Sequence, residues 1–363
     1  MNSNFGEKIV LSVFGESHGA AIGGVLTGLP KGIKIDFDEM EIQRLRRAPG
    51  RDKIATPRKE NDEFEILSGV LDGKTTGAPL ALIIRNGDTI SKNYDSLRDC
   101  PRPSHSDYAA AVKFGGMNDI RGGGHFSGRL TAPIVALGTI CRTALLEKGI
   151  TVGGHILKIT TATDSEFDKV SISAEQLSIL NKAPFPVIDS AAEEKMRAVI
   201  EDARQNGDSV GGMVEIAVTG LPAGLGNPMF NGIENIIAKA LYGIPAVKSV
   251  SFGAGEAFAE MLGSGANDEL YYDENGNVKT KTNNCGGIFG GITNGMPLII
   301  RVALKPTPSI SKPQQTVNLE TKENVTLTVE GRHDPCIVPR ALPALEAMLC
   351  VALADILAGE GKF

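Results

Sequence analysis

Histidines in glycine-rich turns are the first residues in this sequence that could do chemistry. His18 lies in Phe14-Gly15-Glu16-Ser17-His18-Gly19, at the end of a β-like run, and His333 is followed directly by Asp334. An imidazole titrates near neutral pH, and a neighbouring carboxylate can act as a base. We therefore take His18 as a candidate acid and Asp334 as a candidate base, with an ordinary surface position as the alternative for each. His155 has no such setting and is given no role.

Arginine is concentrated between Arg44 and Arg58, where six basic residues accompany one acidic residue. A guanidinium presents a planar fork to phosphate or carboxylate, so this segment is a candidate anion site, although a solvated helix face has the same composition. A second segment, from Arg121 to Thr131, contains three consecutive glycines before an expected helix start. Backbone N–H groups and the helix dipole there would suit a phosphate or a flavin oxygen, and a plain turn is the alternative.

Several common site motifs are absent. The segment Gly69 to Thr75 resembles a P-loop but has three residues between its glycines where four are required, and GxGxxG after a strand, HExxH and GxSxG do not occur. ATP hydrolysis, a Rossmann nicotinamide site, a zinc peptidase and an α/β-hydrolase are therefore disfavoured. The five cysteines are scattered without CxxC, which favours reduced thiols in a cytoplasmic protein and no metal site.

Helix and strand signals alternate without a regular βαβ rhythm, so we expect an α+β fold of mixed layers. We expect a helix that ends at Ala48 and is capped by Asp36 or Asp38, and another over Tyr108–Phe114 that is capped by Asp107. Further helices are expected from Thr131 to Gly149 and over Ala191–Asn206, Gly232–Tyr242 and Ala341–Ala358. Strands are expected over Lys8–Phe14, Leu80–Arg85, Met213–Val218, Leu298–Leu304 and Val325–Val329.

A short internal echo suggests two related halves. The segment Gly23 to Gly32 and the segment Gly211 to Gly224 each join a β-like run to a Gly-Leu-Pro-x-Gly turn. Chance similarity of two strand-turn units is the alternative. No linker divides the chain, so we expect residues 1–363 to form a single domain.

The composition excludes several classes of protein. The 363 residues include 43 glycines and no tryptophan, and the net charge of −6 argues against a globally basic nucleic-acid-binding protein. No secretory signal is visible. The apolar stretch Leu130 to Cys141 is too short to span a membrane, and Ala341 to Leu357 is interrupted by Glu346 and Asp355. Both stretches are expected to be buried helices of a protein without membrane or nucleic-acid partners.

Taken in order along the chain, seven segments resemble the chorismate synthases: FGESHG, RRAPGRDK, RPSHSDY, RGGGHFSGR, GGIFGGITNG, RVALKPTPSI and GRHDPC. The resemblance extends from Gly15 to the C-terminal helix. It implies a β-α-β sandwich of antiparallel sheets enclosing helices, a homotetramer, and a lyase that eliminates phosphate from 5-enolpyruvylshikimate 3-phosphate to give chorismate. The family requires reduced FMN although its reaction has no net redox change, so the hard electronic step belongs to the cofactor.

The resemblance also implies site residues. Catalytic roles fall on His18 as acid to the departing phosphate, His105 near the reduced flavin, and Asp334 as proton relay. Substrate binding falls on Ser17, Arg47, Arg51, Arg102, Arg129 and Arg340. Flavin binding falls on His125, Phe126, Ser127, Ala246, Gly290, Lys305, Pro306, Thr307, Pro308, Ser309 and Arg332. Many family members have arginine where this chain has His125 and glutamate where it has Leu130.

The resemblance leaves the supply of reduced flavin to a partner. A separate flavin reductase is expected, with NADPH as an indirect reductant, since no reducing domain is visible in the sequence. Two other functions are weighed against the lyase: an FMN-dependent oxidoreductase acting on a small phosphorylated acid, and a non-catalytic anion-binding oligomer. The missing nicotinamide motif argues against the first, and the histidines in glycine turns argue against the second.

Overall fold

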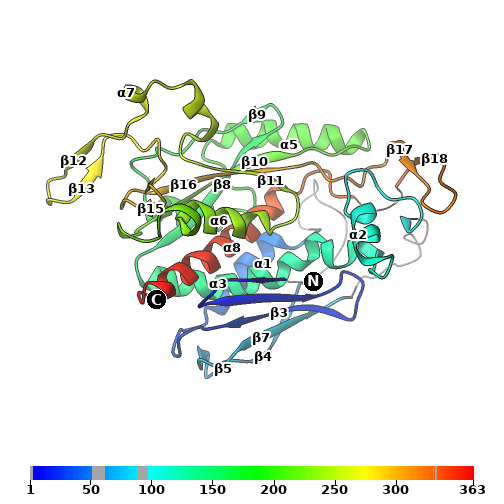
Figure 1. The fold of residues 1–363 in the computed structure, drawn as a ribbon, viewed down its shortest axis with the longest axis horizontal. Helices are drawn as coiled ribbons and strands as arrows, with labels where there is room; N and C mark the ends of the chain where they lie inside the picture. The colour runs from blue at the N-terminus through cyan, green and yellow to red at the C-terminus, as the bar shows by residue number, and fades with distance from the viewer. Residues whose placement is uncertain (1–2, 51–61, 88–96, 330, 332) are drawn as a thin grey trace.

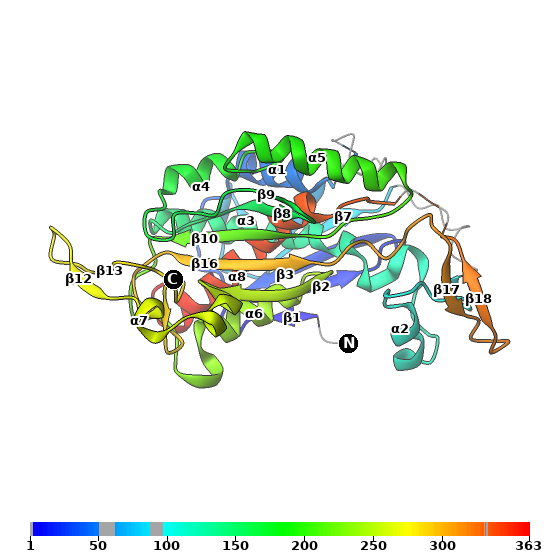
Figure 2. The same cartoon turned by 90° about the horizontal axis from the view of Figure 1, so that it is seen from above.

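Two antiparallel sheets face each other across a layer of helices (Figure 1). The computed structural model describes residues 3–50, 62–87, 97–329, 331 and 333–363. Additional helices lie on the outer face of one sheet (Figures 1 and 2). This arrangement confirms the expected sandwich of antiparallel sheets that enclose helices.

The N-terminal sheet has five strands, and its inner face is apolar. Its order is β1 (Asn4–Phe5), β2 (Val10–Gly15), β3 (Ala21–Thr27), β7 (Leu80–Arg85) and β4 (Phe64–Ser68). Along β7, Leu80, Leu82 and Ile84 are buried, whereas the residues between them are partly exposed. This period of two is typical of a sheet with one face on the core, and the strand expected over Leu80–Arg85 is confirmed.

The C-terminal sheet also has five strands, and both of its faces are covered. Its order is β11 (Val247–Phe252), β16 (Leu298–Leu304), β10 (Gly212–Thr219), β8 (Thr151–Ile159) and β9 (Ala162–Thr163). Helices α4 (Ala174–Leu180) and α5 (Ser190–Gln205) lie on the outer side. Because both faces are covered, β8 is buried along nearly its whole length.

The helices between the sheets are α1 (Phe37–Arg47), α3 (Thr131–Glu147), α6 (Ile233–Tyr242) and α8 (Val338–Gly359). The side chain of Asp36 caps α1, as one of the two alternatives expected. By length and composition alone, α8 and the segment Gly128–Glu147 could cross a membrane, but they are 94% and 83% buried inside the protein. They are the core helices expected from the sequence.

Buried charges join three of these helices. Glu346 of α8 is fully buried, and its carboxylate lies 2.7 Å from Arg46 of α1 and 3.1 Å from Arg142 of α3. Arg46 is therefore a core residue, which corrects the view of the whole Arg44 to Arg58 run as a solvated face or an anion site. Arg44 pairs with Glu41 on its own helix. Residues 51–58 of that run lie outside the described part.

The two halves of the chain share one topology. Strands β2, β3, β7 and β4 occur in the same spatial order as β8, β10, β16 and β11, and α3 and α8 follow the last strand of each half. Thr75 Oγ1 donates to the carbonyl of Pro30 at 2.6 Å, and Thr293 Oγ1 donates to that of Pro222 at 2.7 Å. Each bond ends on the carbonyl of the proline in a Gly-Leu-Pro turn, so the two turns are held in the same way. The expectation of related halves is thus confirmed.

A second similarity between the two halves accounts for the P-loop-like segment. This similarity was not recognised from the sequence. The hairpin of β5 (Val70–Leu71) and β6 (Lys74–Thr75) corresponds to that of β14 (Ile288–Phe289) and β15 (Ile292–Thr293). Gly69 and Gly287, which open the two hairpins, have φ of +85° and +87°. The glycines here serve tight turns, because a positive φ strains other residues.

The remaining elements lie at the ends of the sandwich. They are α2 (Asp107–Phe114), α7 (Gly263–Ala266), the hairpins β12 (Leu270–Tyr272) with β13 (Val278–Thr280) and β17 (Gln314–Val317) with β18 (Asn324–Leu327), and the short 3₁₀ turns η3 (Arg121–Phe126), η4 (Gly128–Leu130), η5 (Met229–Asn231) and η6 (Gly255–Glu260). The strand expected over Val325–Val329 is the second arm of a hairpin and ends two residues early.

Candidate active site

A cavity of about 800 Å³ lies at one end of the helix layer. Arg47, the last residue of α1, lines it, as do Thr131, the first residue of α3, and Ile337, the residue before α8. The N-termini of two core helices therefore meet there, and their dipoles favour an anion. The other lining residues are His18, Pro49 and members of segments 102–106, 122–129, 242–248, 305–309 and 329–341. Both halves of the chain contribute to the wall.

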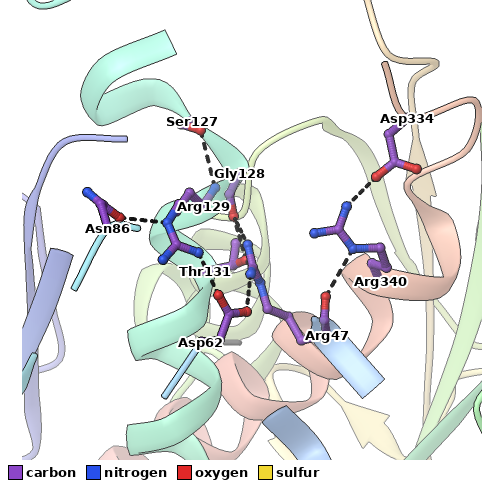
Figure 3. Close-up of polar contacts among 9 residues, drawn as sticks. All are labelled: Arg47, Asp62, Asn86, Ser127, Gly128, Arg129, Thr131, Asp334 and Arg340. Atoms are coloured by element: carbon purple, nitrogen blue, oxygen red, sulfur yellow. Dashed lines mark hydrogen bonds and ion pairs between the residues drawn. The ribbon is translucent and has the colours of Figure 1, made fainter. Parts of the chain in front are cut away.

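One carboxylate holds two arginines on this wall (Figure 3). Asp62 forms an ion pair with Arg47 and a second, at 2.5 Å, with Arg129. Burial opposes ionisation of Asp62, but the charges of the two guanidinium groups outweigh it and lower the pKa of the carboxyl. Asp62 has a φ of +53°, an uncommon conformation of the kind found at functional sites. Two buried cations thus share one anion, which leaves an excess positive charge facing the cavity.

Neutral groups fix the orientation of the same two arginines. Arg47 donates from Nε to Thr131 Oγ1 at 3.1 Å and from Nη2 to the carbonyl of Gly128 at 3.0 Å. Arg129 donates from Nε to Asn86 Oδ1 at 2.7 Å. Each guanidinium is therefore held on two sides before any ligand binds, which reduces the entropy lost on binding.

Across the cavity, Asp334 keeps one carboxylate oxygen available. Its Oδ2 accepts a hydrogen bond from Arg340 of α8, whose Nε donates to the carbonyl of Arg47 at 3.0 Å (Figure 3). The other oxygen, Oδ1, is buried and has no hydrogen-bond partner among the described residues. A buried acceptor without a partner is unfavourable unless a ligand satisfies it. Asp334 is thus suited to accept a proton from a molecule in the cavity.

His18 enters the cavity through a gap left by glycine. A Cβ added to Gly122 would lie 2.2 Å from His18 Nδ1 and 2.7 Å from Ser17 Oγ, so only glycine fits there. The glycine triplet interrupts η3 with positive, non-helical φ at each glycine, and α3 begins later, at Thr131. The triplet therefore does not open the helix, as sequence analysis supposed, but lets the imidazole approach the backbone.

His105 is held by a neighbouring carboxylate. Its Nδ1 lies 2.6 Å from Asp107 Oδ1, and Arg102 donates to both oxygens of Asp107, at 2.7 and 2.9 Å. Hydrogen bonds from Arg102 and His105 overcome the effect of burial and hold the pKa of Asp107 far below its ordinary value. The sequence predicts Asp107 as the cap of α2. That is wrong: the cap position is Ser106, without a side-chain cap bond.

Two lysines lie at another part of the wall. Lys305 donates to the carbonyl of Ser104, and burial together with the charge of Lys248 lowers the pKa of Lys305. Thr307 and Ser309 line the cavity beside them, and Thr307 Oγ1 is buried with no hydrogen-bond partner among the described residues. Ammonium and hydroxyl groups in this arrangement can bind a phosphate.

Most of the residues predicted from the sequence line this one cavity. They are His18, His105, Asp334, Arg47, Arg102, Arg129, Arg340, Phe126, Ser127, Ala246, Lys305, Thr307, Pro308 and Ser309. Ser17 is buried beside Gly122 and Pro306 is exposed next to the lining residues, but neither lines the cavity. Arg51 and Arg332 lie outside the described residues.

The structure does not bring two predicted flavin residues to the cavity. His125 is held away from it, with Nδ1 2.8 Å from the carbonyl of Gly15 and Nε2 2.6 Å from Ser3 Oγ. Gly290 lies in the turn between β14 and β15, where a Cβ added to it would meet no atom within 4 Å. An imidazole that bonds to a strand end therefore stands where many family members carry arginine.

Three residues of the site were not predicted from the sequence: Asp62, Asp107 as a side-chain partner, and Lys248. A usable signal existed for Asp107 alone, because it lies five residues from Arg102 and a buried arginine needs a carboxylate nearby. Lys248 follows the predicted Ala246 by two residues, on the strand that adjoins the cavity loop.

Comparison with known proteins gives one consistent match. Residues 9–358 match the family model described as chorismate synthase. The chain is 48% identical over 351 residues to a chorismate synthase of Thermococcus gammatolerans, with 96% of each chain covered. It is 45% identical to that of Methanothermobacter thermautotrophicus, over 96% of this chain and 92% of the relative. A crystal structure of a chorismate synthase superimposes with a TM-score of 0.76 at 28% identity, covering 98% of this chain and 93% of the other.

Proposed function

The chain belongs to the chorismate synthase family, and from this we propose that its cavity is the active site of a carbon–oxygen lyase that converts 5-enolpyruvylshikimate 3-phosphate to chorismate. One observation carries the assignment of the cavity. The Arg47 and Arg129 pair holds an excess positive charge in the same cavity where Asp334 presents an oxygen without a partner. A site for a phosphorylated acid therefore lies within the same enclosure as a proton acceptor.

The substrate carries two carboxylates and a phosphate, so it needs several fixed cations. Arg47 and Arg129 supply charge that Asp62 only half neutralises. Arg102 and Arg340 are each paired with a carboxylate of their own, so they contribute hydrogen-bond geometry more than net charge. Excess charge at one place favours the developing negative charge of the departing phosphate.

The elimination breaks a C–O bond to phosphate and a C–H bond of the ring. The phosphate leaves with the electron pair of the C–O bond, and His18 donates a proton to it. The proton from the ring is taken up by Asp334 Oδ1, which has no partner among the described residues, while Arg340 holds the other oxygen. The products are chorismate and phosphate, so the step is balanced without net oxidation.

The cavity fits reduced FMN in addition to the substrate. Its volume of about 800 Å³ is at the upper end of ordinary ligand sites, and the Lys248 and Lys305 pair with Thr307 Oγ1 fits a phosphate. Phe126 and Ala246 add apolar lining for a ring. When bound, reduced FMN supplies electron density to the substrate without net oxidation.

We further propose a single-domain cytoplasmic protein that assembles as a homotetramer and receives reduced flavin from a separate reductase. One apolar core extends from Ile9 to Leu357, across both halves, which supports the single domain. Met229, Phe230 and Leu262 are 80 to 87% exposed, which supports contacts between subunits. The two large sheets in the described part are antiparallel, so neither is the parallel sheet of a Rossmann nicotinamide site.

The test is anaerobic incubation of the protein with 5-enolpyruvylshikimate 3-phosphate and reduced FMN, following chorismate absorbance and released phosphate. We expect both products in equal amounts. Arg129→Gln should lower kcat/KM about 100-fold, because it removes a charged contact. The control, Glu201→Gln, removes the surface pair with Arg204 and should leave turnover unchanged. If wild-type protein forms no chorismate, the function is wrong. If Arg129→Gln retains full activity, the location of the site is wrong.

A further inference from the structure

Asp107 occupies the first residue of α2, yet its side chain turns away from the helix. An aspartate there usually satisfies free N–H groups of the first turn. Here it faces the preceding loop, where it accepts hydrogen bonds from the backbone N–H and the guanidinium of Arg102. The carboxylate is buried, and Arg102 also donates to Ser309 Oγ at 3.1 Å. The cluster thus joins the loop before α2 to the loop after β16.

The contacts of His105 decide which ring nitrogen carries the proton. Nδ1 lies 2.6 Å from Asp107 Oδ1, an oxygen that can only accept. Two acceptors would repel at this distance, so Nδ1 bears the hydrogen and donates it. Arg102 Nη2 also lies 3.1 Å from Nδ1, but it can donate to Asp107 Oδ1 at 2.9 Å instead. In a neutral ring, Nε2 is then left with its lone pair.

That lone pair lies on the edge of the ring that contains Cε1 and Nε2, beside Gly123. His105 lines the cavity, and a Cβ added to Gly123 would lie 3.5 Å from both Cε1 and Nε2 of the ring. A side chain at position 123 would begin at van der Waals distance from this edge of the imidazole, and glycine leaves that space open. A ligand in the cavity can therefore approach Nε2.

We propose that Asp107 is a positioning residue that holds His105 with its proton on Nδ1, so that Nε2 is the atom that exchanges a proton with the bound ligand. Arg102 keeps Asp107 ionised and in place. The proposal rests on the proposed function only in naming the ligand, which is reduced FMN or the substrate beside it. The tautomer itself follows from the contacts of the chain.

The charges around His105 agree with a neutral ring at pH 7. The groups that face it are Arg102 and Asp107 from its own segment and Lys305 from the loop after β16. Burial lowers the pKa of His105, Arg102 and Lys305 lower it further, and the contacts with Asp107 oppose this without reversing it. An anionic ligand near Nε2 would raise the pKa again, so ligand binding would favour uptake of a proton at that atom.

The first test examines the wild-type protein and uses a variant only to assign signals. In full-length protein labelled with ¹⁵N-histidine, the side-chain nitrogen spectra distinguish the two tautomers, and His105→Gln identifies the signals of residue 105. We expect the Nδ1–H tautomer at pH 7 and a pKa below 6.5. Detection of the Nε2–H tautomer in wild-type protein would overturn the proposal. This result is independent of turnover, so it separates the proposal from the function assigned to the cavity.

The second test changes the carboxylate. Asp107→Asn should give a mixture of tautomers, lower the pKa of His105, and reduce kcat about 100-fold while KM for the substrate changes less than about threefold. Asp107→Glu keeps a carboxylate and should restore the Nδ1–H tautomer. Glu201→Gln, which also removes a carboxylate from an arginine pair, should change neither measurement. An unaltered tautomer in Asp107→Asn, or full activity, would exclude the positioning role.

Discussion

The carboxylates around the cavity differ in how many of their oxygens are occupied. Both oxygens of Asp62 are bound by arginines, and both oxygens of Asp107 are bound by Arg102. Asp334 has one oxygen on Arg340 and one without a partner in the described part of the chain. The number of available oxygens therefore separates two carboxylates that orient other side chains from one that can take part in proton transfer.

Replacing this proton acceptor should slow turnover without weakening substrate binding. Asp334→Asn retains the shape of the side chain and a bond to Arg340 but cannot accept the proton, so kcat should fall about 100- to 10,000-fold with little change in KM. Steady-state chorismate formation under anaerobic conditions measures both constants. A variant with lowered affinity and unchanged kcat would make Asp334 a binding residue instead.

At the residue scale, the sequence predicts residues with distinctive chemistry better than it predicts their partners. His18, Arg47 and Lys305 could be selected because their motifs are local. Asp62 could not, because its partner Arg129 lies 67 residues away and only the fold brings them together. His155 was given no role, since nothing in its local sequence indicates that two carboxylates bind it.

Helices in the centre of the molecule are joined by a buried charge. Glu346 connects α8 to α1 and α3 through Arg46 and Arg142, as described above. Removal of one partner from such a group leaves uncompensated charge in the core. Because Arg47 follows Arg46, this cluster also determines where α1 places its last residue in the cavity.

Glu346→Gln should lower the free energy of unfolding by about 3–5 kcal/mol, since two buried guanidinium groups lose their anion. Urea denaturation followed by circular dichroism measures the change. The surface variant Glu201→Gln should stay within about 0.5 kcal/mol of wild type. Equal effects of the two substitutions would mean that the buried cluster does not hold the helices together.

A second charged cluster lies in the C-terminal sheet. His155 of β8 is 2.8 Å from Asp164 and 3.2 Å from Glu215 of β10, and Glu215 is 2.9 Å from Arg301 of β16. Burial disfavours the charged imidazole, but the hydrogen bonds to the two carboxylates outweigh it and raise the pKa of His155. Folded protein therefore binds this proton more tightly than unfolded protein does.

The stability that this proton contributes should be complete below about pH 6.5, the ordinary value for histidine, and should disappear as the pH rises through the raised value. We expect the difference in unfolding free energy between wild type and His155→Gln to be largest near pH 6 and to shrink towards pH 9. Urea titrations at several pH values measure it. A difference that grew with pH would contradict the charged state. Turnover should be unaffected, since His155 does not line the cavity.

At the scale of elements, caps and apolar periodicity allowed the long helices and central strands to be predicted, with errors of at most three residues at their ends. The pairing of the strands could not be predicted from the sequence, because β3 pairs with β7, which begins more than fifty residues later. The P-loop-like segment showed the same limit. Its glycines form a hairpin turn, and this structural role becomes clear only from the corresponding hairpin in the other half.

For the molecule as a whole, net charge and local charge have opposite signs. The chain carries −6, whereas six permanent cations on the cavity wall face three carboxylates. The cations are Arg47, Arg102, Arg129, Lys248, Lys305 and Arg340. The low-dielectric walls concentrate this field, which favours the approach of a multiply charged anion.

The excess charge makes substrate capture sensitive to salt. Between about 0.01 and 0.15 M ionic strength the Debye length falls from about 30 to 8 Å, so kcat/KM for the substrate should drop about tenfold, mostly through KM. Initial rates in increasing KCl at constant pH measure this. A salt-independent KM would show that the wall cations do not guide the substrate.

Two related halves meet around this cavity, and the central claim is that they form a lyase whose flavin is not consumed. The most direct measurement is the number of chorismate molecules formed per reduced FMN, under strict anaerobic conditions with excess substrate, while flavin absorbance is recorded. We predict many turnovers per flavin, with the flavin still reduced at the end. One flavin oxidised for each substrate converted would contradict the account and indicate an oxidoreductase.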